Sequence, residues 1–110
     1  MTTRRVVLRD ERSGRDTRHL EAYLDASGAL HIDGHDLGPA TSPVSSDGEY
    51  EWHRTIPASE VPRLLALLGG EPGDGILDVL ADYYTGRSSY ELERIISESD
   101  LRSEFSSWSS

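Results

Sequence analysis

The sequence has no cysteine, no lysine and no long apolar run. The lack of cysteine excludes disulfide bonds, thiolate nucleophiles and cysteine-ligated zinc sites. The longest apolar stretch runs only from Leu64 to Leu68, whereas a membrane-spanning helix needs about 20 apolar residues. No apolar segment follows the N-terminal arginines, as it would in a secretory signal peptide. We therefore expect a cytoplasmic protein that does not enter a membrane.

The 110 residues suffice for one domain with one core, so we expect a single domain over residues 1–110. Hydrophobic residues make up 35% and charged residues 28% of the chain, which is usual for a folded globular protein. A mean hydropathy of -0.53 indicates that the core is modest and that much of the surface is polar.

Negative charge dominates, with a net charge of -9, and it is unevenly distributed. Residues 1–20 hold six arginines and three acidic residues, while residues 21–110 hold five arginines and seventeen acidic residues. The net charges of these two segments are therefore +3 and -12. An acidic surface repels nucleic-acid phosphates and anionic lipids and attracts basic protein surfaces. We expect no nucleic-acid partner, and a basic protein is the partner that the charge favours.

The hydrophobic pattern changes halfway along the chain. Alternating apolar and polar residues predict four strands, over residues 4–10, 17–25, 29–36 and 48–56. Apolar residues at helical spacing then predict three helices, over residues 59–69, 74–85 and 88–98. Strands followed by helices indicate an α+β fold, a four-stranded antiparallel meander with the three helices packed on one face.

The tail, residues 101–110, carries conflicting signals. Leu101, Phe105 and Trp108 have helical spacing, but the serines around them favour an extended chain. Two large aromatic residues in a terminal segment indicate that it is packed against the rest of the protein. We predict a short C-terminal strand at an edge of the sheet.

The predicted strands place every histidine on one polar face of the sheet. These are His19, His31, His35 and His53. Carboxylates alternate with them at Glu21, Asp25, Asp33, Glu49 and Glu51. By the same alternation, Arg5 and Arg9 of the first strand share this face.

Two interpretations of this face are open. In the first it is a metal or acid–base site made from His31, Asp33, His35 and His53. Residues i and i+4 of a strand are about 13 Å apart, so His31 and His35 cannot easily share one ion, and a site needs one of them, Asp33 and a cross-strand partner. In the second it is a solvated face with cross-strand ion pairs, worth roughly a few tenths of a kcal/mol each.

Tyr50 and Trp52 have the parity of core residues in the predicted fourth strand, where they would fill the space under the helices. An exposed Trp52 would instead anchor a protein partner. The residues that we assign to a protein-binding surface are Glu21, Asp33, Glu49, Glu51 and Trp52.

Three strings resemble small acidic α+β proteins encoded in actinobacterial genomes. They are HDLGP at 35–39, SDGEYEW at 46–52 and IPASEVPRLL at 56–65. The resemblance covers most of the chain and implies a bacterial, cytoplasmic protein. Some small acidic α+β proteins of such genomes are immunity proteins that block a toxin.

The sequence contains no phosphate-binding loop and no nucleophile elbow. We therefore favour a non-enzymatic binding module of immunity or inhibitor type, without a cofactor, acting on a basic protein. The alternative is a small metal- or ligand-binding protein that uses the histidine face, with the loop 37–48 as a lid. In one form of this hypothesis the protein is a hydrolase. A third hypothesis is a domain that assembles into a homo-oligomer.

Overall fold

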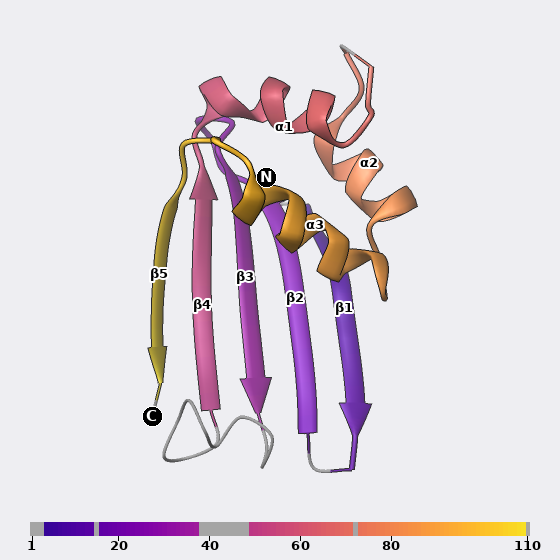
Figure 1. Ribbon diagram of the computed structural model, residues 1–110, viewed down its shortest axis with the longest axis vertical. Helices are drawn as coiled ribbons and strands as arrows, with labels where there is room; N and C mark the ends of the chain where they lie inside the picture. Colours follow the sequence, from indigo (N-terminus) through magenta and orange to yellow (C-terminus); the bar gives the residue numbers. More distant parts are fainter. Residues whose placement is uncertain (1–3, 15, 38–48, 72, 110) are drawn as a thin grey trace.

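The computed structural model in Figure 1 shows an α+β fold with five antiparallel strands and three helices. It describes residues 4–14, 16–37, 49–71 and 73–109. The strands are β1 Arg5–Ser13, β2 Asp16–Leu24, β3 Leu30–Leu37, β4 Glu49–Ile56 and β5 Glu104–Ser109. The helices are a 3-10 turn, η2 Ala58–Glu60, followed by α1 Val61–Leu67, α2 Ile76–Tyr83 and α3 Ser88–Glu98.

The strands pair in chain order, each antiparallel to the next, which confirms the predicted meander and its C-terminal edge strand. The first strand is longer than predicted and extends to Ser13, because the charged residues after Asp10 continue the pairing with β2. The predicted lid, apart from Leu37, lies outside the described residues, and so does the side chain of Glu49.

One apolar cluster fills the space between the sheet and the helices. Alternate residues of the strands point into it, among them Leu20, Leu30 and Ile56, which are fully buried. The helices add Leu64, Leu80 and Leu92. Figure 1 shows α3 in front of β1, β2 and β3, while β4 and β5 have no helix in front of them. Within the described residues no helix is long and apolar enough to cross a membrane.

A β-bulge in β1 reverses the orientation predicted for Arg9. The pairing with β2 passes from Val7–Glu21 to Arg9–Leu20, so that Leu8 is the additional residue. As a result Leu8 and Arg9 are both buried, with 1% and 3% of their surface exposed. The prediction that Arg9 lies on the open face is therefore wrong, because one inserted residue shifts the alternation of the strand.

Arg9 instead joins the sheet to α3. Its Nε donates a hydrogen bond to Ser89 Oγ at 2.9 Å, and its Nη1 lies 3.3 Å from Glu93 Oε1. The guanidinium carbon is 3.6 Å from the centre of the Tyr90 ring. These three contacts all come from one helix, so they fix the position of α3 over the sheet.

We predict that Arg9→Ala lowers the free energy of unfolding by about 2–3 kcal/mol, because it removes a buried charged hydrogen-bond donor and the cation over Tyr90. The matched variant is Arg5→Ala, on the same strand and the opposite face, which should change stability by about 0.5 kcal/mol or less. Urea denaturation followed by circular dichroism measures both. Equal losses for the two variants would contradict the role given to Arg9.

Candidate binding surfaces

The face of the sheet opposite the core carries all four histidines. The strand register aligns their side chains with those of neighbouring residues in three cross-strand rows. The first row contains Asp10, His19, His35 and Glu51; the second contains Glu21, Asp33 and His53; the third contains Arg5, Tyr23, His31, Thr55 and Glu104. We call this surface the histidine face.

Each histidine on this face contacts a carboxylate. The nitrogen-to-oxygen distances are 2.8 Å for His19–Glu21, 2.7 Å for His31–Asp25, 3.5 Å for His35–Glu51 and 2.8 Å for His53–Asp33. The histidine side chains are 23% to 38% exposed, so water and a partner can reach them. In the third row Tyr23 stacks on His31, with ring centres 4.7 Å apart.

The histidine contacts favour the charged form of two carboxylates. The pKa of Glu21 is lowered from its ordinary value, mainly by the hydrogen bond with His19. The pKa of Asp25 lies well below its usual range, first because Ser27 donates hydrogen bonds to it and then because of His31. Asp25 Oδ1 also accepts the backbone N–H of Ala29, so the same carboxylate closes the β2–β3 hairpin.

The residues of the metal hypothesis do not converge. His31 contacts Asp25, His35 contacts Glu51, and Asp33 contacts His53 on the next strand. Among the described residues, no group of three or more histidines and carboxylates is arranged to hold a metal ion. Metal binding on this face stays a prediction that the described geometry does not support.

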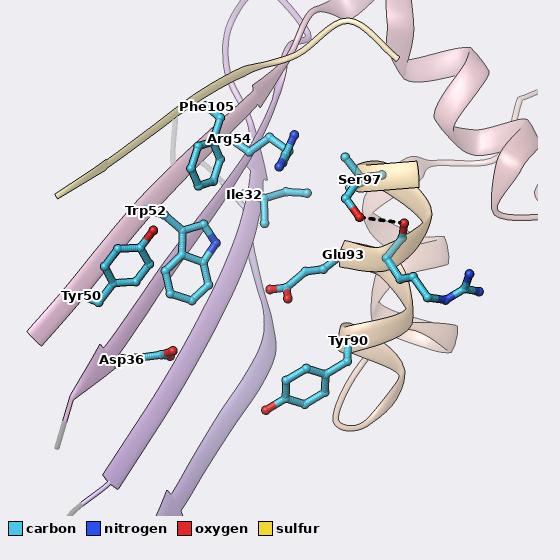
Figure 2. A pocket seen from close by; sticks show the side chains of 11 residues that line it. Ile32, Asp36, Tyr50, Trp52, Arg54, Tyr90, Glu93, Ser97 and Phe105 are labelled. Atoms are coloured by element: carbon cyan, nitrogen blue, oxygen red, sulfur yellow. Dashed lines mark hydrogen bonds between the residues drawn. The ribbon is translucent and has the colours of Figure 1, made fainter. Parts of the chain in front are cut away.

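The other face of the sheet has a groove that the sequence did not reveal. It has a volume of about 490 Å³ and lies between α3 and strands β3, β4 and β5 (Figure 2). Its floor is formed by Ile32, Tyr50, Trp52, Arg54 and Phe105, and its wall on α3 includes Tyr90, Glu93 and Ile96. In the sequence, the alternation placed Tyr50 and Trp52 on the core side of the fourth strand, which is where the groove lies. Phe105 belongs to the tail, whose pattern gave conflicting signals.

The Trp52 ring lies over β3 at Gly34, the residue opposite it in the sheet. A Cβ atom on Gly34 would lie 2.1 Å from two carbons of the indole ring, so only glycine leaves room for the ring. Trp52 packs partly against the core and stacks with Tyr50, the ring centres being 5.5 Å apart. It is therefore half-buried, and it both contacts the core, as predicted, and lines the groove.

Two charged groups of the groove differ in their pairing. Asp36 Oδ2 lies 3.3 Å from Nη1 of Arg18, but burial outweighs this ion pair and raises the pKa of Asp36. Arg54 donates from Nη1 to Ser103 Oγ at 2.9 Å, and its guanidinium carbon lies 5.0 Å from the centre of the Phe105 ring. Burial lowers the pKa of Arg54 from its ordinary value.

The residues assigned to a protein-binding surface therefore occupy two faces. Glu21, Asp33 and Glu51 lie together on the histidine face, whereas Trp52 lies in the groove on the other side. A single flat partner surface cannot contact both sets, because the sheet separates them.

Comparison with known proteins does not assign this chain to a family. No family model matches this chain, and no curated protein and no solved structure shows significant similarity to it. The resemblance to small actinobacterial proteins stays a prediction.

We predict that Gly34→Ala lowers the free energy of unfolding by about 1–3 kcal/mol, because the new methyl group displaces the Trp52 ring. In a Trp52→Leu background the same substitution should be neutral or stabilising, since alanine is preferred to glycine in a strand. Urea denaturation of the four proteins measures both effects. A cost for Gly34→Ala that does not depend on residue 52 would refute this explanation.

The lowered pKa of Glu21 predicts a pH dependence of stability. A depressed pKa in the folded state gives stability above the unfolded pKa, which is lost as the pH falls through the folded value. Wild type should therefore exceed Glu21→Gln in stability most clearly above about pH 5, and the difference should shrink towards about pH 3. Denaturation curves across this range test it, with Glu71→Gln, an exposed residue outside the sheet, as the control. A difference that stays constant with pH would contradict the ion pair.

Proposed function

We propose that the protein is a non-enzymatic, cytoplasmic binding module of immunity or inhibitor type that recognises a basic protein through its histidine face. The observation that carries the proposal is the excess of carboxylates on an uncovered sheet face. In the three rows there are five carboxylates, at positions 10, 21, 33, 51 and 104, and a single arginine, Arg5; the register places Arg12 in the next row of the same face.

The face is available for a partner. The helices bury their apolar residues against the opposite side of the sheet, so no helix in the described part of the chain lies over the histidine face. With neutral histidines the three rows carry a net charge of four negative units. Such a surface accelerates and orients the approach of a basic partner and repels nucleic acids and anionic lipids.

The histidine contacts support recognition by a fixed surface. Glu21, Asp33 and Glu51 each contact an imidazole, and Glu21 also lies 3.2 Å from Nη1 of Arg5. These contacts restrict the carboxylate side chains before a partner arrives, so less conformational entropy is lost on binding. An arginine of the partner can then pair with a carboxylate oxygen that is already in place.

The test compares two triple variants that remove the same number of charges. The first, Glu21→Gln/Asp33→Asn/Glu51→Gln, neutralises the histidine face. The second, Glu71→Gln/Asp82→Asn/Glu98→Gln, neutralises exposed acids outside the sheet. Immobilised wild type is used to capture basic proteins from a bacterial extract at low salt, and the affinity of each captured protein is then measured by calorimetry.

We expect the histidine-face variant to bind the captured basic protein at least about tenfold more weakly than wild type, and added salt to weaken the wild-type complex. The second variant should stay within about twofold of wild type. Equal losses in the two variants would show that only net charge matters and would contradict the proposal. Binding that is unchanged in both variants would do the same.

A further inference from the structure

We propose that the groove between α3 and strands β3–β5 binds a small organic carboxylate with a flat apolar body, whose carboxylate pairs with Arg54 and whose body lies against Trp52. This site is on the opposite side of the sheet from the histidine face, so it is independent of the function proposed above. Figure 2 shows Arg54 and Trp52 together on the strand side of the groove.

Arg54 forms no close ion pair, and Glu93 acts on it only at longer range, where its charge partly offsets the effect of burial on the pKa of Arg54. A guanidinium has five N–H donors, and among the described residues this side chain donates to the neutral Ser103 Oγ. No carboxylate among the described residues lies within ion-pair distance of it. The other charged side chains of the groove are paired, as Asp36–Arg18, Glu93–Arg9, Arg94–Glu91 and Arg94–Glu98. A half-buried cation without a close ion pair is costly, and a ligand carboxylate that pairs with it lowers that cost.

The floor beside Arg54 is lined by aromatic rings. Because Gly34 has no side chain, the Trp52 indole lies against β3 and extends the surface formed with Tyr50. Phe105, which is 51% exposed, borders the same groove next to Arg54. Flat apolar groups stack on such rings, and burying them there removes apolar surface of both partners from water.

The size and charge of the groove define the ligand further. Its volume of about 490 Å³ is within the range of small-molecule sites, which combine apolar walls with a few polar groups. Arg54 is paired with Ile32 across the strands and Asp36 with Tyr50, so the backbone positions of Arg54 and Asp36 are four residues, or about 13 Å, apart along the strands. Asp36 and Glu93 repel every negative charge in the groove, and the repulsion grows with the charge of the ligand, so a monoanion fits better than a phosphate dianion.

The experiment is a titration of the full chain with 4-phenylbutyrate, followed by calorimetry and by the indole N–H signals in NMR spectra. The uncharged 4-phenylbutanamide is the matched ligand, because it has the same body without the charge. We expect the carboxylate to bind about tenfold more tightly than the amide. Arg54→Gln should abolish this preference, and Trp52→Leu should weaken both ligands.

Arg63→Gln is the matched protein control, since Arg63 is on α1 and already pairs with Glu60 and Asp100. It should bind 4-phenylbutyrate as wild type does. Circular dichroism establishes that each variant is folded. The proposal is overturned if wild type does not bind at millimolar concentrations, if the amide binds as tightly as the carboxylate, or if Arg63→Gln has the effect of Arg54→Gln. Tighter binding of a peptide with a C-terminal phenylalanine would overturn the small-molecule assignment.

Discussion

The register between β2 and β3 determines what each side of the sheet does. Their hairpin is closed by Asp25, whose Oδ1 accepts hydrogen bonds from the backbone of Ser27 and Ala29, and by Gly28, whose φ of 88° favours glycine. With this register Leu20 and the other apolar residues face the helices, and the histidines face away from them. A slip of one residue would exchange the two sets, burying the ionisable groups and exposing the core.

The same register places like groups side by side on the histidine face. His19 is opposite His35, and Glu21 is opposite Asp33. Two carboxylates directly across a strand pair destabilise it. The contacts with imidazoles offset this repulsion, because Glu21 contacts His19 along its own strand and Asp33 contacts the histidine of β4. The ion pairs thus make an acidic face compatible with a sheet.

The groove exists because the helices cover only part of the opposite face. α3 has 11 residues, which makes it about 16 Å long, enough to cross three strands spaced about 4.8 Å apart but not five. Arg9 fixes α3 over the β1 side through Ser89 and Glu93. Tyr50, Trp52 and Phe105 therefore line an open groove beside α3, and Trp52 is accommodated there by Gly34.

The sequence alone determined the order of strands and helices, the α+β class and the side of the sheet that holds the histidines. Alternation and helical spacing are local patterns, so they can be recognised without knowing which residues are in contact. The tertiary structure decided the rest. The bulge at Leu8 buried Arg9, since an inserted residue inverts the alternation and leaves no mark in composition. The pairing of each histidine and the groove at Arg54 and Trp52 depend on register and helix position, which join residues far apart in the chain.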